Sequence, residues 1–403
     1  MKWILFAFKN VFRNRRRSLT AALITAVGTA AVLVGGGFAL FTYEALRELS
    51  ARETGHVVLA ERSYFSGDED VPMQHGLAGS GALAEQFRAL PGVRAVLPRV
   101  QFSGLISNGD KTAVFIGTGI SPEREFRLRG IQTSFLAGEP LAADADVPEV
   151  VLGSELAKLM KARPGSSLTL LATTTEGSLN AVDVLVRGVI TTNVPEVDKR
   201  LVYADIAAVQ KLLLTDKVST LSVYLKETDD TAAVAVQLGA ANPGLAVRTW
   251  LDLAFFYQAV RALYNRIFGM LGIIMAIIVL FAMTNTLGMA VAERTREIGT
   301  LRAIGTLPGE IVRNFVLEGA VIGVAGTLVG FAIAGAVTVF LAFAGIQMPP
   351  PPGRSSGYPL LVNFSGWMYA CTGFAVVAVS AAAAYSVSAK AARKPITEAL
   401  AHV

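Results

Sequence analysis

The sequence predicts an α-helical membrane protein with four transmembrane helices and one large extracytoplasmic α+β domain between helices 1 and 2. Hydrophobic residues make up 53% of the 403 residues and charged residues only 17%, whereas soluble domains carry about 25% charged residues. The excess lies in four apolar runs, at about 18–41, 267–291, 315–345 and 365–388. Each run is longer than the roughly 20 helical residues that cross a hydrocarbon core.

The first apolar run is interpreted as transmembrane helix 1, at 18–44. Four arginines in "FRNRRRS" (12–18) stand directly before it, and basic residues beside a span favour the cytoplasmic side. A cleaved signal peptide has an apolar core of about 7–15 residues. Because this run is longer and shows no clear small-x-small cleavage site, we interpret it as an uncleaved anchor with a cytoplasmic N-terminus.

Residues 45–265 have an ordinary globular composition and are predicted to form an α+β domain outside the membrane. Short stretches of alternating residues bounded by turn residues predict strands, and "NGDK" (108–111) is a hairpin turn signal between two of them. The predicted strands lie at 55–61, 93–107, 112–120, 167–173, 180–190 and 218–227, and the predicted helices at 153–162 (with Ser154 as its N-cap), 203–214 and 230–242.

The two ends of this domain are predicted to be helical stalks. "FTYEALRELSARE" (41–53) continues the first span as a polar helix, and "WLDLAFFYQAVRALYNRI" (250–267) leads into the second with apolar residues at helical spacing. Such stalks would transmit motion better than a flexible Gly/Ser linker. The alternative is that the helices merely cap the domain.

The remaining runs are assigned to transmembrane helices 2, 3 and 4, at 266–292, 314–345 and 365–389. Basic residues are concentrated in the connection 293–313 and in the tail 390–403, whereas the Pro-rich loop 346–364 carries one Arg and no Lys. The positive-inside rule therefore predicts cytoplasmic N- and C-termini. The prolines make the outer loop stiff, either as a plain connector or as a brace for the outer domain or a partner.

The segment "ERTREIGTLRAIG" (293–305) is charged yet carries apolar residues at every third position. Helix–helix connections usually take about 2–8 residues, so this longer one is predicted to be a helix that docks on a partner or on the membrane surface. Its two glycines each weaken a helix by about 1 kcal/mol relative to Ala, which suggests a turn or a close approach. The residues singled out are Glu293, Arg294, Arg296, Glu297, Ile298, Gly299, Leu301, Arg302, Ile304 and Gly305.

Chemistry within this chain has little support in the sequence. No G-x-x-x-x-G-K-[ST] motif occurs to hold a nucleotide, and no residue spacing suggests a catalytic base, its orienting group and a pocket. The single Cys371 excludes an internal disulfide. The histidines His56, His75 and His402 are scattered without ligand spacing, so we interpret them as surface or turn residues and expect no metal site or cofactor.

Three polar residues fall within or beside apolar runs. Glu318, the only carboxylate in 315–345, is interpreted either as one half of an ion pair with a nearby Arg or as part of a proton relay. Thr284 and Asn285 are interpreted as helix–helix hydrogen-bonding residues rather than a substrate site. The pI of about 9.3 reflects basic residues at the ends of apolar runs, which indicates membrane orientation and not nucleic-acid binding.

The stretch "AVAERTREIGTLRAIGTLPGEIVRNFVLEGAVIGVAGTLVG" (290–330) resembles the FtsX/MacB/LolC–LolE superfamily of ABC-transporter permeases, the type VII or mechanotransmission class. In that family the E-R-x-R-E-I-G-x-L-[RK]-A-x-G pattern marks the cytoplasmic coupling helix. "FAFKNVFRNRRRSLTA" (6–21) is similar to the family's amphipathic N-terminal helix, placed here at 1–17. "EVVLGSELAKLMKARPGSSLTL" (149–170) is similar to a unit of its outer domain.

The resemblance implies that the chain is a permease and not itself an enzyme. A cytoplasmic ABC ATPase dimer would bind ATP and Mg and would contact the ten residues singled out at 293–305. Two permease subunits, a second copy or a homologue, would form the complex in a bacterial inner membrane. A periplasmic carrier or adaptor and membrane lipid are the further partners implied, and nucleic acid is not.

The resemblance leaves the cargo open. Release or export of a lipoprotein or lipid fits a large outer domain without a fused ATPase, although "GGGFALFTYEAL" (35–46) stands where LolC and LolE carry an MNGF-like stretch. MacB-like efflux of a small amphiphile or peptide is the alternative. A non-transporting signalling complex is a third reading. A secondary transporter is disfavoured because the chain has only four spans and no broken-helix repeat.

Overall fold

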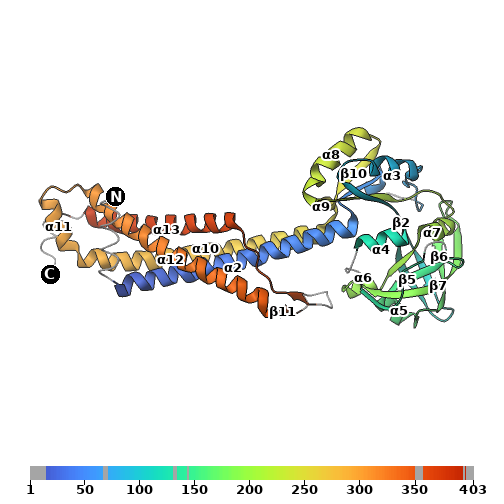
Figure 1. The fold of residues 1–403 in the computed structure, drawn as a ribbon, viewed down its shortest axis with the longest axis horizontal. Coiled ribbons are helices and arrows are strands. Elements are labelled where there is room, and N and C mark those ends of the chain that lie inside the picture. The colour runs from blue at the N-terminus through green and yellow to red at the C-terminus, as the bar shows by residue number, and fades with distance from the viewer. Residues whose placement is uncertain are drawn as a thin grey trace. The chain divides into compact units, whose positions relative to one another are not determined.

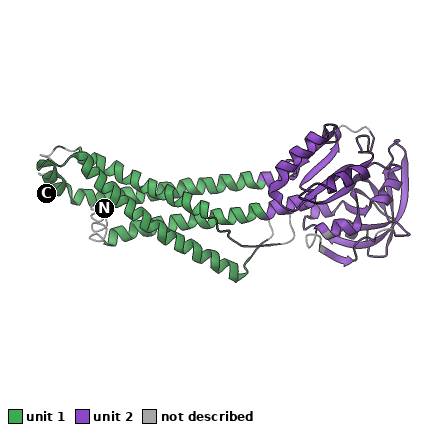
Figure 2. Ribbon diagram, turned by 45° about the horizontal axis from the view of Figure 1, so that its top comes forward, with its two compact units in different colours: residues 1–44, 260–347, 359–403 green, residues 45–259, 348–358 purple. Residues whose placement is uncertain are grey.

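The computed structural model of the protein describes residues 15–66, 71–129, 134–142, 145–349, 357–393 and 395. The predicted N-terminal helix therefore lies almost entirely outside the described residues, as do most of the tail and residues 350–356 of the Pro-rich loop. Two compact units are present, coloured separately in Figure 2. Unit 1 comprises residues 1–44, 260–347 and 359–403, and unit 2 comprises residues 45–259 and 348–358.

Unit 1 is built from helices long and apolar enough to span a membrane (Figure 1). The described residues contain four: α2 (Arg15–Thr54), α10 (Phe255–Glu293), α12 (Pro308–Ala344) and α13 (Gly366–Ala392). A short helix, α11 (Thr295–Ala303), connects α10 to α12, and the two-residue strands β11 (Gln347–Met348) and β12 (Tyr358–Pro359) pair between α12 and α13. The predicted fold class, with four spans and a large domain between the first and second, is confirmed.

Glycines on α12 let its neighbours approach closely. A Cβ added at Gly319 would lie 2.6 Å from the Cβ of Ala384, and one at Gly323 would lie 2.9 Å from the Cβ of Ser380, both on α13. The next pair faces α2: a Cβ at Gly326 or at Gly330 would lie 2.7 Å from the Cβ of a threonine, Thr25 or Thr29. Two small-xxx-small pairs therefore hold α12 against two different helices, a common device in membranes.

Unit 2 contains a mixed sheet in the order β10-β1-β9-β2-β3-β8-β5-β7-β4, with β6 pairing β2 and β7 (Figure 1). Most pairs are antiparallel, and β3–β8 and β5–β7 are parallel. The strands are β1 (Val57–Glu61), β2 (Val93–Ser107), β3 (Thr112–Ile120), β4 (Ser134–Gly138), β5 (Glu149–Gly153), β6 (Ser167–Thr173), β7 (Leu179–Thr191), β8 (Leu201–Asp205), β9 (Thr220–Leu225) and β10 (Leu245–Thr249).

Short helices connect and cover these strands. They are η1 (Tyr64–Ser66), α3 (Ser80–Arg88), α4 (Pro122–Arg129), α5 (Ser154–Leu159), α6 (Pro195–Asp198), α7 (Ile206–Leu213), η3 (Thr228–Asp230), α8 (Thr231–Ala241) and α9 (Trp250–Leu253). A large apolar cluster fills much of the core of the unit, and among its fully buried members are Val57, Val96, Phe115 and Leu152. A smaller cluster around Ile120, Val151 and Ile190 completes the core. The long helices also reach this unit, because α2 contributes residues 45–54 and α10 contributes residues 255–259.

The strand β2 belongs to both halves of the sheet. Its first part, up to Arg99, pairs with β9, and its second part, from Val100 onward, pairs with β3. Residue 99 is therefore the point at which β2 exchanges one neighbour for another.

Some predicted boundaries are wrong for local reasons. The helix predicted at 203–214 begins only at Ile206, because Leu201–Asp205 forms the strand β8 between β3 and β5. Gly153, not Ser154, is the N-cap of α5, and the Ser154 hydroxyl instead donates to Asp198 Oδ2 at 3.1 Å. The second stalk is interrupted at Ala254, between α9 and α10.

Candidate functional site

The predicted docking segment forms α11, a short helix with sharp ends. Arg294 precedes it with non-helical angles, φ −101° and ψ 10°. After it, Gly305 has φ +105°, a left-handed conformation that glycine adopts without steric cost. Pro308 then opens α12, where a missing N–H does no harm. The predicted role of Gly305 as a turn residue therefore has a structural basis.

One side of α11 is buried against the other helices of unit 1. Thr295, Ile298 and Gly299 are the buried residues of the helix. Ile298 is 5% exposed and belongs to an apolar cluster with Val291 of α10, Ile311 and Phe315 of α12, and Ala392 of α13. A helix packed in this way cannot be displaced without displacing the helix ends that it contacts.

A buried ion pair reinforces this packing. Arg294 Nη1 lies 3.4 Å from Glu318 Oε2 of α12, and the two side chains are 9% and 5% exposed. Of the two interpretations of Glu318, the ion pair is the one the structure shows. Arg294 Nη2 has no hydrogen-bond partner among the described residues. Removing one member of a buried pair strands the other charge at a cost of about 3–5 kcal/mol.

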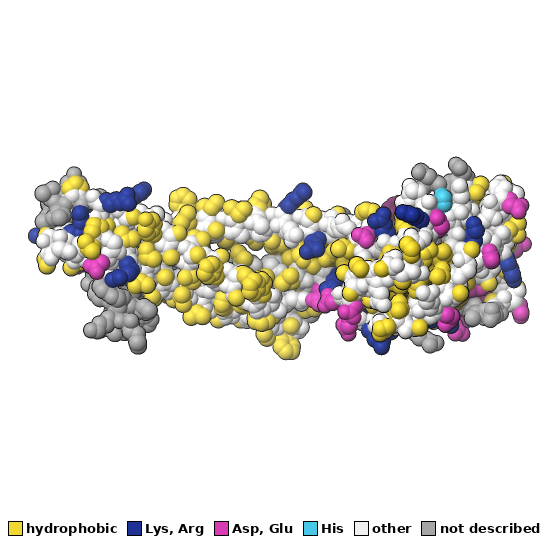
Figure 3. Space-filling model, turned by 90° about the horizontal axis from the view of Figure 1, so that it is seen from above, with side chains coloured by type: hydrophobic (Ala, Val, Ile, Leu, Met, Phe, Trp, Pro, Cys, Tyr) yellow, Lys and Arg dark blue, Asp and Glu magenta, His cyan; other side chains and the backbone are white. Residues whose placement is uncertain are grey.

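The remaining residues of the segment are exposed or half-buried. Leu301 is 49% exposed and Ile304 is 79% exposed, and Leu307, just beyond the predicted docking segment, is 67% exposed. Arg296 and Glu297 are exposed and Arg302 is half-buried. Figure 3 shows Lys and Arg side chains gathered at the end of the helices that carries α11, while hydrophobic side chains cover the middle of the helices.

The structure thus divides the ten singled-out residues. Arg294, Ile298 and Gly299 lie inside unit 1, where their environment is this chain itself. Glu293 forms an ion pair with Arg17 of α2, at 2.6 Å. The exposed part of the segment is therefore made by Arg296, Glu297, Leu301, Ile304 and Gly305, with Arg302 half-buried beside them.

A second open surface lies on the membrane-spanning part of α10. Phe281, Ala282, Thr284, Asn285, Gly288, Met289 and Ala292 line a shallow groove of about 660 Å³. Asn285 is exposed there, and no hydrogen bond joins it to another described residue. The interpretation of Asn285 as a helix–helix hydrogen-bonding residue is thus not met within the described part of this chain, and any such bond would need a group from outside it.

The last turns of α2 are fastened inside unit 2 through His56. Of the surface and turn positions predicted for His56, the structure shows the second: it lies at a bend between α2 and β1 and is only 6% exposed. Its Nδ1 accepts from the backbone N–H of Leu225 at 3.2 Å, and its Nε2 lies 3.1 Å from Thr228 Oγ1, which donates to Glu48 of α2 at 2.9 Å. Burial lowers the pKa of His56, more than the nearby Glu48 carboxylate raises it.

The described residues hold no group of three or more His, Cys, Asp or Glu side chains placed to bind a metal ion. Cys371 is a free, exposed thiol on α13. Three features stand out in the described residues: the exposed side of α11, the groove on α10 and the hydrogen-bonded C-terminal end of α2.

Comparison with known proteins accounts for both units. Residues 18–241 match the family profile described as MacB-like periplasmic core domain, and residues 269–396 match the FtsX-like permease C-terminal profile. The lipoprotein-releasing system transmembrane protein LolC of Neisseria meningitidis is 28% identical over 250 residues, which are 59% of this chain and 60% of that protein, less than two thirds of its length.

Two further similarities cover other shares of the chain. The lipoprotein-releasing system transmembrane protein LolE of Haemophilus influenzae is 24% identical over 335 residues, 80% of this chain and 79% of that protein. The periplasmic region of MacB from Actinobacillus actinomycetemcomitans, a crystal structure, aligns with 50% of this chain and 93% of its own length at 14% identity, with a TM-score of 0.35.

Proposed function

The chain belongs to the family of ABC transporter permeases that combine a MacB-like periplasmic core domain with an FtsX-like permease segment, and from this premise we propose that it couples ATP hydrolysis in a separate ATPase subunit to movement of its extracytoplasmic domain. The observation that carries the proposal is the two-sided character of α11. Its inner side is locked into the spans by Ile298 and by the Arg294–Glu318 pair, and its outer side presents Leu301 and Ile304.

A coupling helix needs both properties. The exposed apolar residues Leu301 and Ile304 would be seated in a groove of the ATPase, with Arg296, Glu297 and Arg302 setting the register through polar contacts. Because α11 packs on the ends of α10, α12 and α13 through the Ile298 cluster, a push on it would move those helices together. A polar loop of the same length would absorb the push instead.

The ATPase itself is proposed as a cytoplasmic dimer that binds ATP and Mg, because this chain carries no P-loop to do so. The permease would be its non-catalytic partner in a bacterial inner membrane. Both termini would face the cytoplasm, since the basic residues cluster at 12–18, 293–313 and in the tail.

A second permease subunit is proposed to cover the groove on α10. Asn285 is exposed within an apolar helix, and a polar side chain facing hydrocarbon is costly unless a neighbouring helix supplies a partner. Small residues such as Gly288 and Ala292 in the groove let another backbone approach. An amide both donates and accepts, so a second copy of Asn285 or a homologue's polar residue would satisfy it.

Release of a lipoprotein or lipid from the inner membrane is the cargo that we favour. Its support is the pair of relatives named as lipoprotein-releasing proteins, one of which matches over 80% of this chain. The spans carry few charges that could line a hydrophilic path, which suits a substrate handled at the outer leaflet. The MacB-like match over 18–241 favours the alternative, efflux of a small amphiphile or peptide through a periplasmic adaptor.

Charge reversal on α11 tests the proposal. The tagged chain is purified from its host with Arg296→Glu and Glu297→Arg together, and co-purifying proteins are identified by mass spectrometry. The reversal should remove the ATPase while leaving the permease inserted. The control reverses Glu196 and Lys199, an exposed ion pair in unit 2, and should retain the ATPase. An ATPase that stays bound and stimulated in the first variant would falsify the assignment of α11.

A further inference from the structure

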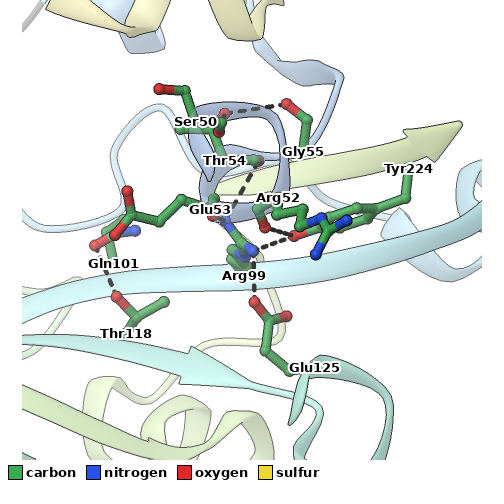
Figure 4. A network of polar contacts seen from close by, with 10 residues as sticks. All are labelled: Ser50, Arg52, Glu53, Thr54, Gly55, Arg99, Gln101, Thr118, Glu125 and Tyr224. Carbon is green, nitrogen blue, oxygen red and sulfur yellow. Dashed lines mark hydrogen bonds and ion pairs between the residues drawn. The ribbon is translucent and has the colours of Figure 1, made fainter. Parts of the chain in front are cut away.

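The C-terminal end of α2 is closed by a buried arginine from the sheet of unit 2 (Figure 4). Arg99 of β2 donates from Nη1 to the carbonyl oxygens of Glu53, at 2.8 Å, and Thr54, at 3.3 Å. Its Nη2 donates to Tyr224 of β9, whose hydroxyl in turn donates to the Arg52 carbonyl at 3.2 Å. The last carbonyls of α2 are therefore held directly by Arg99 or through Tyr224.

These contacts fit the chemistry of a helix end. The final carbonyls of an α-helix have no partner within the helix and carry a partial negative charge. A guanidinium is always positive and offers several donors in a fixed plane, so one side chain can meet adjacent carbonyls at once. Arg99 is 6% exposed, which shields these bonds from competing water.

The same guanidinium is also paired with a buried carboxylate. Glu125 of α4 is 0% exposed and forms an ion pair with Arg99 Nη2. Because α4 directly follows β3 along the chain, Glu125 belongs to the β3 side of the sheet, whereas Tyr224 belongs to β9. One side chain thus contacts the helix and groups from both halves of the sheet.

Arg99 lies at the point on β2 where the strand changes its pairing partner. Arg99 pairs with Thr220 of β9, and the next residue, Val100, pairs with Gly119 of β3. Arg99 therefore lies where β2 passes from one set of strands to the other. A force that enters through Arg99 reaches both sets at their common strand.

The other long helix joins unit 2 differently. Thr249 and Asp252 form a capping box at the N-terminus of α9. The helix ends at Leu253, and its C-cap, Ala254, has φ −88° and ψ 60°. A new helix, α10, begins at Phe255. The helical hydrogen-bond ladder is thus interrupted before α10, whereas α2 runs without a break to Thr54.

We propose that Arg99 is the positioning residue through which α2 moves the extracytoplasmic domain, with the break at Ala254 allowing α10 to follow. The inference rests on the proposed function, because it takes the motion of α2 from the ATP cycle. We call the contacts of Arg99 with the end of α2, Tyr224 and Glu125 the Arg99 joint. This joint would convert an axial or lateral displacement of α2 into a displacement of the strands on both sides, those next to β9 and those next to β3. Losing the joint would leave the domain folded but disconnected from the helix that drives it.

The test must separate this role from simple stability. Arg99→Gln alone removes the cation opposite the buried Glu125 carboxylate and is expected to destabilise the domain. The double variant Arg99→Met/Glu125→Leu replaces the pair by apolar side chains, a change that proteins often tolerate, while removing the donors to Glu53 and Thr54. Arg99→Lys is the second variant, because it keeps the charge opposite Glu125 but lacks the planar fork.

The readout is the distribution of distances between two spin labels on the full-length chain in lipid nanodiscs, in a Cys371→Ala background. One label replaces Glu53, an exposed residue at the end of α2, and the other replaces Thr112, an exposed residue of β3. The control variant is Arg47→Gln, which removes an ion pair between α2 and Asp229 on the surface of unit 2.

We expect the wild type and Arg47→Gln to give one narrow distribution. Arg99→Met/Glu125→Leu and Arg99→Lys should give a broad one while their melting temperatures stay near that of the wild type. Adding the co-purified ATPase with ATP and Mg should leave this distribution unchanged where the joint is intact, because α2 and β3 then move together, and should shift it in the Arg99 variants, in which α2 moves without β3.

Narrow distributions that do not change with ATP in either folded Arg99 variant would overturn the inference and reduce Arg99 to a stabilising residue. Broad distributions in the Arg99 variants that do not shift with ATP would count against the proposed function instead, because Arg99 would still be shown to hold α2 while the ATP cycle would not move it.

Discussion

Arg294 and Glu318 form a buried ion pair, with 3.4 Å between Nη1 and Oε2, that ties the residue before α11 to the third turn of α12. The pair belongs to the same stretch of chain that was expected to meet a partner, yet it faces inward. Its consequence is that α11 is fixed to the spans by a charge contact as well as by the apolar contacts of Ile298.

Breaking this pair should destabilise unit 1. Arg294→Gln leaves Glu318 charged and buried, and we expect a loss of about 3–5 kcal/mol in the free energy of unfolding. Arg294→Met/Glu318→Leu should recover most of that loss, because neither charge remains. Unfolding of the purified chain in detergent measures both. Equal destabilisation in the single and double variants would show that the pair itself is not what matters.

Exposed and buried apolar residues of α11 should respond in opposite ways. Leu301→Ser/Ile304→Ser should weaken ATPase binding while changing stability by no more than about 0.5 kcal/mol, as surface substitutions usually do. Ile298→Ala should instead cost about 2–5 kcal/mol of stability, because it empties a packed site. Binding of the co-purified ATPase and thermal unfolding distinguish the two effects, and Val236→Ser on α8, 74% exposed, should change neither.

The glycines of α12 offer a test of the helix packing within one element. Gly326→Ala would bring a Cβ to 2.7 Å from Thr25, so it should destabilise by about 1–3 kcal/mol through overpacking. Gly335→Ala is the matched control on the same helix, because a Cβ there meets nothing within 4 Å. It should be neutral or stabilising by up to about 1 kcal/mol. The contact is refuted if Gly326→Ala melts at the wild-type temperature.

Stability should fall as the pH is lowered because of His56. Burial holds the pKa of His56 below its ordinary value of about 6.5 in the folded state, so below pH 6.5 the unfolded chain binds a proton that the folded chain does not. Linkage then requires stability to be lost as pH falls through about 6.5 toward the lower folded pKa. Melting temperatures between about pH 7.5 and 5 should show a steeper decline for the wild type than for His56→Gln; parallel curves would argue against this role.

Cross-linking on α10 tests whether a second copy covers the groove. In a Cys371→Ala background, Asn285→Cys should give a disulfide-linked dimer in oxidised membranes, because an isologous contact brings a residue near its own copy. Phe374→Cys on α13, whose native side chain is 80% exposed, is the control and should stay monomeric. Dimers from Phe374→Cys and none from Asn285→Cys would place the contact elsewhere.

Elements whose sequence pattern lies within one short stretch could be predicted from the sequence. The strands at 93–107 and 112–120 were predicted with the bounds that the structure shows, since alternating apolar residues and an Asn-Gly turn define a hairpin within one short stretch. The four spans were equally readable, because length and hydropathy alone determine them. The strand β8 was missed because "LVYAD" runs directly into the apolar face of α7 and has no turn residue to separate them.

The inner and outer sides of α11 could not be separated by spacing. Residues three apart on a helix are rotated by about 300°, so Ile304 is turned by about 120° from Ile298. The apolar residues Ile298, Leu301 and Ile304 therefore do not share one side of the helix: Ile298 is buried, whereas Leu301 and Ile304 are exposed. Two residues whose roles the sequence did not predict have distant partners: Arg99 hydrogen-bonds to Tyr224 across 125 positions, and His56 to Thr228 across 172. Their burial depends on the sheet and leaves no signal in the local sequence.

The most direct test of the account is a photo-cross-link from the outer side of α11. A photoreactive amino acid replaces Ile304, which is 79% exposed, and Phe374 serves as the matched position on the membrane-spanning helix α13. The cross-linked products in host membranes are identified by mass spectrometry. We predict that position 304, and not position 374, links to a protein with an ATP-binding P-loop. If position 304 captures only lipid or the permease itself, α11 is not the contact through which ATP hydrolysis is coupled.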